Sequence, residues 1–84
     1  MIHGKNYIFR TVTMIYTGVF SQEEEEFFII RKAAWVADTG RWADCLVTCE
    51  FKEVEPYPPG KPVFIYKSGL LDIVEIEKLP LEQK

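Results

Sequence analysis

The sequence predicts a single α+β domain over residues 1–84, a small antiparallel sheet or partly closed barrel of four to six strands with one short α-helix. Most of the chain is dense in β-branched and aromatic residues, which are typical of strands; 14% of it is aromatic. Only one stretch, about residues 40–49, places its apolar residues at helical spacing. A length of 84 residues suits one domain, and an apolar content of 48% supplies its core. Residues 1–5 and 81–84 are expected to be loose ends.

The first part of the chain predicts a β-hairpin. Residues Tyr7–Phe20 are too many for one regular strand. We therefore expect two strands, or one bent strand with a break near Thr13 or at Gly18. The acidic run Ser21–Glu26 is predicted to be a solvated turn, because like charges repel one another. Residues Phe27–Val36 then form the return strand, since two antiparallel strands joined by a short loop are the simplest topology.

The stretch after Val36 changes from strand to helical periodicity. Four apolar residues recur at positions i, i+3, i+4 and i+7, which share one helix face. They are Trp42, Cys45, Leu46 and Cys49. We predict a short helix over about residues 40–49, which must pack this face on the sheet because so short a helix is unstable alone. Asp38 or Thr39 is the predicted N-cap, since either side chain can accept hydrogen bonds from free amides at a helix start.

The two cysteines, Cys45 and Cys49, lie four residues apart on the same predicted helix face. Helical geometry directs such a pair poorly for a disulfide, so we expect reduced thiols packed as small hydrophobic side chains. The alternative is half of a metal site. That site needs two more ligands, and His3 is the only histidine, so no metal is predicted. Reduced cysteines favour a cytoplasmic protein.

The second half of the chain predicts two further strands after a loop. Residues Glu50–Gly60 carry three of the five prolines, which only a loop or a sheet edge tolerates. Residues Val63–Tyr66 form a short strand, and Lys67–Gly69 a tight turn. Residues Leu70–Leu79 form the last strand.

Asp72 is the acidic residue that the alternation of this last strand directs inward, on the same face as Val74. A buried carboxylate without a partner is costly. We therefore expect Asp72 to pair with Arg10, with Arg41 or with a backbone donor near Gly40.

Charge and motifs narrow the classes of function. Ten basic residues dispersed among thirteen acidic ones, with a net charge of −3, do not supply the basic patch on which nucleic-acid affinity depends. No apolar run approaches the length of a membrane span, and the first ten residues lack a signal peptide. No P-loop or glycine-rich phosphate motif occurs, and no cofactor is predicted. An enzyme would have to work with carboxylates such as Asp38, Asp44 and Asp72 alone, so we expect a protein that is not an enzyme.

The rarer residue types gather around the predicted strand-to-helix turn. The candidate ligand-binding residues are Trp35, Asp38, Thr39, Gly40 and Arg41, with Asp72 from the last strand. A helix N-terminus offers free amides to an anion, Arg41 adds a bidentate donor, and a tryptophan ring can stack on a base. These residues predict a pocket for a small anionic, nucleotide-type ligand. The alternative is structural: both tryptophans belong to the core, an N-cap explains Asp38 or Thr39, and Arg41 forms an ion pair.

The chain from Tyr7 to Pro80 resembles small bacteriophage-encoded proteins that share a W-V/I-A-D-T-G-R motif and have no assigned activity. The most distinctive parts are Trp35–Leu46, within AAWVADTGRWADCL, and Glu53–Tyr57, within EFKEVEPYPPG. The resemblance implies an accessory protein in the cytosol of an infected bacterium. In that setting, small non-enzymatic proteins often block host defence, either by occupying a host protein or by sequestering a nucleotide signal. The resemblance is an analogy about the cellular setting alone, and it does not assign a role to any residue.

Three functions follow as hypotheses. The first is a binding module that sequesters a nucleotide-type signal and so counteracts host defence. The second is an inhibitor that binds a host protein directly, which suits an acidic surface facing a basic partner. The third is a virion or assembly component. High apolar content and sheet edges favour a homo-oligomer in any of these cases, with a dimer as the default.

Overall fold

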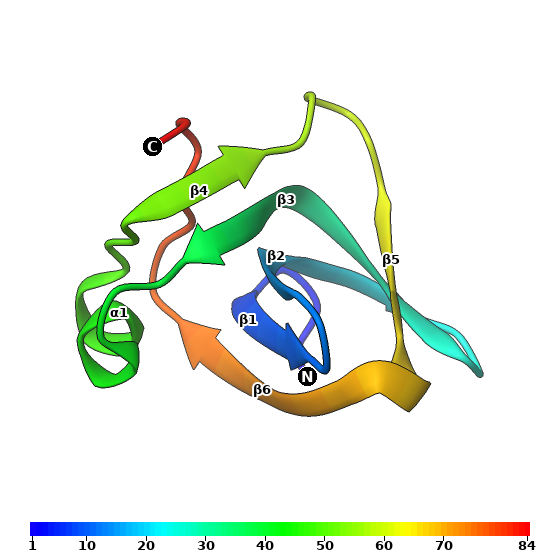
Figure 1. Ribbon diagram of the computed structural model, residues 1–84. Coiled ribbons are helices and arrows are strands. Elements are labelled where there is room, and N and C mark those ends of the chain that lie inside the picture. The colour runs from blue at the N-terminus through cyan, green and yellow to red at the C-terminus, as the bar shows by residue number, and fades with distance from the viewer.

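The computed structural model describes all of residues 1–84 and contains six strands, one α-helix and one 3₁₀ turn (Figure 1). In chain order these are β1 (Asn6–Thr11), β2 (Ile15–Glu23), β3 (Phe27–Asp38), α1 (Trp42–Thr48), β4 (Glu53–Pro56), β5 (Val63–Tyr66), η1 (Lys67–Gly69) and β6 (Leu70–Ile76). The predicted α+β class, the strand number and the single short helix are confirmed. The sheet does not close, so the open-sheet alternative holds.

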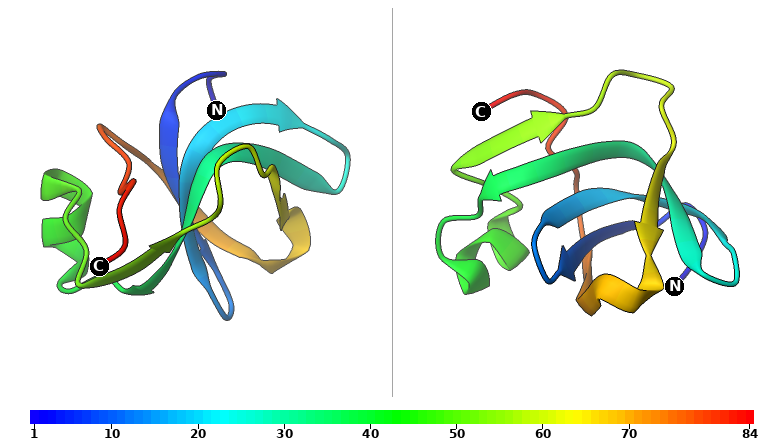
Figure 2. Two further views of the ribbon diagram at one scale, coloured as in Figure 1. Left: turned by 90° about the horizontal axis from the view of Figure 1, so that it is seen from above. Right: turned by 45° about the vertical axis from the view of Figure 1, so that its right-hand side comes forward.

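All strand pairs are antiparallel, and the sheet has the order β4-β3-β2-β1-β6. Strand β5 lies off this path and pairs with the first half of β3, while β4 pairs with its second half. One long strand therefore serves two partners on the same edge. Figure 2 shows the result, a strongly curved sheet with α1 at one end and β5 at the other.

The division of β3 coincides with Lys32, whose φ of 49° is in the left-handed region. Residues Phe27–Ile30 pair with β5 before this point, and Ala34–Asp38 pair with β4 after it. A residue of this conformation bends a strand, as in a β-bulge. The bend lets the two halves of β3 face different parts of the molecule.

The hairpin boundaries differ slightly from those predicted. The break near Thr13 is confirmed, because β1 ends at Thr11 and β2 begins at Ile15. Strand β2 runs through the expected turn as far as Glu23, which pairs with Phe28. The backbone pairing can continue to Glu23 because glutamate side chains at the exposed end of a hairpin point into solvent. The main chain remains free to form the hydrogen bonds between the two strands.

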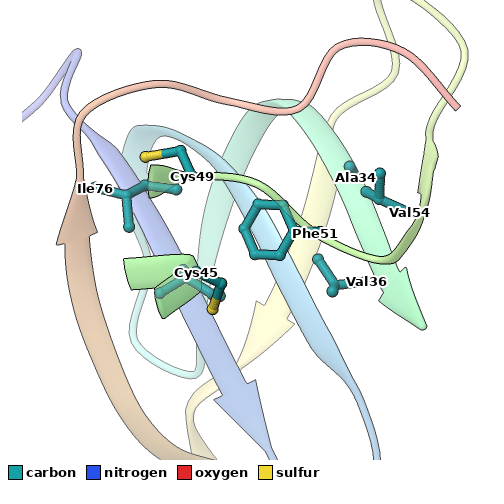
Figure 3. Packing of buried hydrophobic residues seen from close by; sticks show 8 residues of the cluster. Ala34, Val36, Cys45, Cys49, Phe51, Val54 and Ile76 are labelled. Carbon is teal, nitrogen blue, oxygen red and sulfur yellow. The ribbon is translucent and has the colours of Figure 1, made fainter. Parts of the chain in front are cut away.

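The first core lies beneath α1. Its buried residues are Ile8, Ala34, Val36, Cys45, Cys49, Phe51, Val54 and Ile76, with Trp42 and Leu46 packed against them. Figure 3 shows Phe51 and the two cysteines facing residues of β3, β4 and β6. The predicted apolar side chains therefore pack on the sheet, but the helix is shorter than the expected residues 40–49, and Cys49 follows it as the C-cap with a φ of 60°. Both thiols are free and buried.

The second core lies on the other face of the sheet. It consists of Tyr7, Phe9, Phe20, Ile30, Ala33 and Ile65. Since Tyr7 and Phe9 belong to it while Ile8 belongs to the first core, β1 is covered on both faces. This explains why β1 reads as a nearly continuous apolar run rather than as an alternating one.

The predicted N-cap was wrong. Position Arg41 takes the cap conformation, and no side chain caps the helix. The Asp38 Oδ1 atom instead accepts a hydrogen bond from the Gly40 N–H at 2.9 Å. Gly40 has a φ of +70°, so the chain turns once between Asp38 and the helix. The carboxylate stabilises that turn and does not reach the helix amides.

The region after α1 contains a strand that the sequence did not predict. Residues Glu53–Pro56 form β4 within the expected loop, and Pro56 ends it at the sheet edge. The last residues are also less loose than expected. Lys84 exchanges two backbone hydrogen bonds with Val54, at 2.9 and 3.0 Å, and its Nζ atom lies 2.9 Å from a Glu50 carboxylate oxygen.

Thr17 is fully buried, and its Oγ1 atom has no hydrogen-bond partner. It lies opposite Ile8 and Ala34 of the first core. An unpaired buried hydroxyl loses its hydration without compensation, so Thr17→Val should raise the free energy of unfolding by about 1 kcal/mol. Urea denaturation measures the change. The exposed Thr13→Val is the matched control and should have no effect; a destabilised Thr17→Val would contradict the expectation.

Candidate functional site

A groove lies on the surface where the β1–β2 turn, β3 and the end of β4 meet. Its volume is about 400 Å³. We call it the Trp35 groove, and its lining residues are Met14, Trp35, Glu55, Pro56, Tyr57 and Pro58. Most of this wall is apolar or aromatic, and it is formed by segments that are far apart in the sequence.

Trp35 is presented by the alternation of β3. Ala34 and Val36 on either side of it belong to the first core, so the indole of Trp35 points to the opposite face. There it remains 38% exposed. Its cross-strand partners are Tyr16 on β2 and Glu55 on β4, which places Trp35 at the centre of a three-strand surface.

Tyr57 forms the far wall of the groove. Its backbone N–H donates a hydrogen bond to the Ala33 carbonyl at 2.9 Å, which holds the chain against β3 immediately after Pro56. Partial burial raises the pKa of the Tyr57 hydroxyl, and the neighbouring Tyr16 raises it further. The phenol is therefore protonated at neutral pH and can donate a hydrogen bond.

Met14 forms the near wall of the groove, and a tight turn of the chain fixes its position. The Thr11 backbone N–H and its hydroxyl both donate to the Met14 carbonyl, each at 2.8 Å. The Tyr16 hydroxyl lies 2.9 Å from the Met14 sulfur. An unbranched thioether adapts to irregular partners, so this turn supplies an adaptable side of an otherwise rigid aromatic groove.

A second depression of about 330 Å³ adjoins the groove and shares Met14 and Trp35 with it. Val12 and Leu71 border this depression and are 73% and 62% exposed. The two depressions together form a continuous surface rich in exposed apolar side chains. Such contiguous patches mark interaction sites more often than scattered exposed residues do.

The charge at the groove is negative. Glu55 lines it, and Glu53 lies two residues earlier on the same exposed face of β4. Neither carboxylate forms an ion pair within the chain. The nearest basic residue of the adjoining depression, Arg10, is already engaged with Asp72. The groove therefore offers unpaired negative charge beside aromatic surface.

The structure does not bring the six predicted site residues into one pocket. Thr39, Gly40 and Arg41 line a separate depression of about 430 Å³. Lys52 and Lys84 line it as well, together with Asp44 and Glu50, so its charge is mixed. The helix beside it has seven residues. Asp38 and Thr39 bond within the turn itself, to the N–H and the carbonyl of Gly40 respectively.

Asp72 has the first of its three predicted partners. The Arg10 guanidinium binds it through two hydrogen bonds of 2.9 and 2.5 Å and lies 4.6 Å from the ring centre of Trp42. The side chain of Asp72 is 39% exposed, so the expectation of an inward carboxylate was wrong. The residue lies on β6, the strand at the edge of the sheet.

The Arg10–Asp72 pair predicts a pH-dependent stability. The hydrogen bonds from Arg10 hold the pKa of Asp72 below its ordinary value of 3.8. The contribution of the pair is therefore fully present above that value, and it is lost as the pH falls through the lowered pKa of the folded state. The effect should be small, because both side chains are more than a third exposed. Thermal unfolding of wild type and Asp72→Asn should differ at neutral pH, and the difference should shrink progressively as the pH falls below 3.8 and through the lowered pKa; a difference that stays constant across this acid range would contradict this.

Sequence reasoning missed most of the groove. It included Trp35 among the candidate residues but not Met14 or Glu55, and it assigned Trp35 to a pocket with Arg41. The register of β2, β3 and β4 brings the groove residues together, and register depends on long-range pairing. The only indication of the groove in the local sequence was the Glu55–Pro56–Tyr57–Pro58 segment, in which two prolines hold Tyr57 at the edge of the sheet.

No cluster of three or more histidine, cysteine, aspartate or glutamate side chains is arranged to hold a metal ion. The one α-helix is far too short to span a membrane. Comparison with protein-family models, with curated proteins and with solved structures finds no match to this chain. The groove itself is therefore the guide to function.

Proposed function

We propose that this protein is a non-enzymatic binding module that holds a protein partner in the Trp35 groove. The observation that carries the proposal is the gathering of exposed apolar side chains around two joined depressions. Five of the eleven exposed large hydrophobic residues border them, namely Val12, Met14, Trp35, Tyr57 and Leu71.

The kinds of residue present support a protein partner over a nucleotide. Tryptophan, tyrosine and methionine are enriched where proteins bind one another, and tryptophan and tyrosine supply much of the binding free energy. The Trp35 groove contains no basic side chain and carries Glu55, so it is ill suited to a phosphate. The depression beside Arg41 contains basic side chains but also two carboxylates and no tryptophan.

The setting of this binding is also part of the proposal. The resemblance to bacteriophage-encoded proteins favours a partner in the cytosol of an infected bacterium. Occupying a host protein there would counteract host defence without any chemical step. This direct inhibition was the second hypothesis from the sequence, and the groove now favours it over sequestration of a nucleotide signal.

Site-specific photocrosslinking tests the proposal. A photoreactive phenylalanine analogue replaces Tyr57 in the groove, and in a matched variant it replaces Tyr66. Tyr66 is an exposed aromatic residue on β5, away from the groove. Irradiation of the producing bacteria should give a discrete adduct from position 57 only, and Trp35→Ala should abolish it. Equal adducts from both positions, or none from position 57, would refute the groove as the binding surface.

A further inference from the structure

We propose that the Trp35 groove takes an extended, proline-rich segment of its partner that carries a basic residue beside the prolines. This inference rests on the proposed function and specifies its ligand. Four features of the groove support it: its aromatic rings, its unused hydrogen-bond donors, its charge and the occupied edge of β4.

The aromatic rings stand on neighbouring parts of the sheet. Tyr16 on β2 lies directly opposite Trp35 on β3, and Tyr57 follows β4 in the same groove as Trp35. Trp35 and Tyr57 thus supply two aromatic rings to the wall of the groove, beside Pro56 and Pro58. A polyproline II helix has a regular three-residue repeat of apolar rings and docks in aromatic-lined grooves of this kind.

Two donors of the groove have no partner in the chain. The Trp35 indole N–H and the Tyr57 hydroxyl make no hydrogen bond, whereas the Tyr16 hydroxyl is directed to the Met14 sulfur. A polyproline II segment forms no internal hydrogen bonds, so its carbonyl oxygens are free to accept. Donors and acceptors are therefore complementary. A ligand whose carbonyls are already bonded, such as a helix, would leave both donors unused.

The charge of the groove selects a basic residue beside the prolines. Glu55 lines the groove, Glu53 lies on the same face, and neither is paired. An arginine or lysine of the ligand would pair with Glu55. It would also lie near Trp35, the cross-strand neighbour of Glu55, where a cation interacts favourably with the indole face.

The structure disfavours two other occupants. An added β-strand would need the outer edge of β4, but Lys84 already holds the N–H and carbonyl of Val54 on that edge. A second copy of the chain, packed groove to groove about a two-fold axis, would bring each Glu55 toward its symmetry mate. Two unpaired carboxylates of like charge would then be buried together, which is costly.

Nuclear magnetic resonance of the ¹⁵N-labelled full chain tests the inference. The probe is an acetylated peptide of about six prolines with a terminal arginine, made with the arginine at either end. The Trp35 indole N–H signal should move on titration, while that of Trp42 in the first core should not. A glycine–serine peptide with the same arginine, and an oligoproline with glutamate in its place, are the controls. Trp35→Ala should weaken binding by about 30-fold, and Glu55→Gln should weaken it by about fivefold for the arginine peptide alone.

The outcomes separate the inference from the proposed function. Equal binding of the glycine–serine peptide, or no movement of the Trp35 signal, overturns the proline-rich ligand. If the crosslink from position 57 is nevertheless seen, the groove binds a protein of different chemistry. If the groove signals instead shift with protein concentration alone, a second copy occupies the groove and the inference fails. Should Trp35→Ala not fold, Tyr57→Phe tests the hydroxyl donor and should weaken binding while leaving the melting temperature unchanged.

Discussion

Replacing Phe51 with alanine should lower the free energy of unfolding by about 3–5 kcal/mol. Phe51 is 3% exposed and lies in the first core with Cys45 of α1, the C-cap residue Cys49 and Val54 of β4. Figure 3 shows its ring among these side chains. Its removal takes away part of the apolar contact between the helix and the sheet and leaves a cavity in the first core.

A loss of this size matters because a domain of this length has little stability to spare, on the order of 5–15 kcal/mol. Chemical denaturation followed by circular dichroism measures the change. Phe64→Ala is the matched control. It removes the same kind of side chain, but Phe64 is 51% exposed and its ring packs against the ring of Phe27. The control should cost about 1 kcal/mol or less. Equal losses from the two variants would show that Phe51 does not join helix and sheet.

The sequence predicted the local structure well where apolar residues repeat at one clear period. The helix face of Trp42, Cys45 and Leu46 and the short strand Val63–Tyr66 are found as expected, while Cys49 packs with them from the C-cap. Phe51 and β4 were missed because the prolines after Val54 indicated a loop. Pro56 is compatible with a strand only because it ends one at the sheet edge, and the neighbours of that edge are not visible in the sequence.

The candidate site was harder to predict than the fold for the same reason. Trp35 was selected because tryptophan is rare, and it was grouped with Arg41 because the two are close in sequence. Trp35 lies on a strand while Arg41 lies beyond a turn at Gly40, so their side chains line different depressions. The groove instead depends on which residues of β2 and β4 lie opposite Trp35, and cross-strand register is set by long-range packing.

The bend at Lys32 connects the fold to the groove. Since β3 changes direction there, its second half pairs with β4 and brings Trp35 beside Glu55 and Tyr57. Its first half pairs with β5 and closes the second core around Ile30 and Ile65. The bend directs the two halves of β3, and with them β4 and β5, to different parts of the molecule. The same local conformation therefore stabilises the core and forms the surface that we propose as the binding site.

Gly18→Ala should lower the free energy of unfolding by about 1–3 kcal/mol, because it adds a methyl group where no space exists. A Cβ atom at Gly18 would lie 2.7 Å from the Ile30 Cδ1 atom and 3.1 Å from the Arg31 carbonyl oxygen. Ile30 is fully buried, and the carbonyl belongs to the backbone of β3, so neither can easily move. The register of β2 and β3 shifts at this point, and the short Cβ distances show that a side chain at residue 18 would collide with β3.

Gly69→Ala is the matched control for this second prediction. A Cβ atom there would meet nothing within 4 Å, and its φ is not in the left-handed region. The control should leave stability within about 0.5 kcal/mol of wild type. Thermal and urea unfolding of Gly18→Ala and Gly69→Ala measure the two changes in stability. Because β2 carries Tyr16 opposite Trp35, a strand displaced by Gly18→Ala should also shift the Trp35 indole N–H resonance. An unchanged resonance with full stability would mean that β2 and β3 are not held together at Gly18.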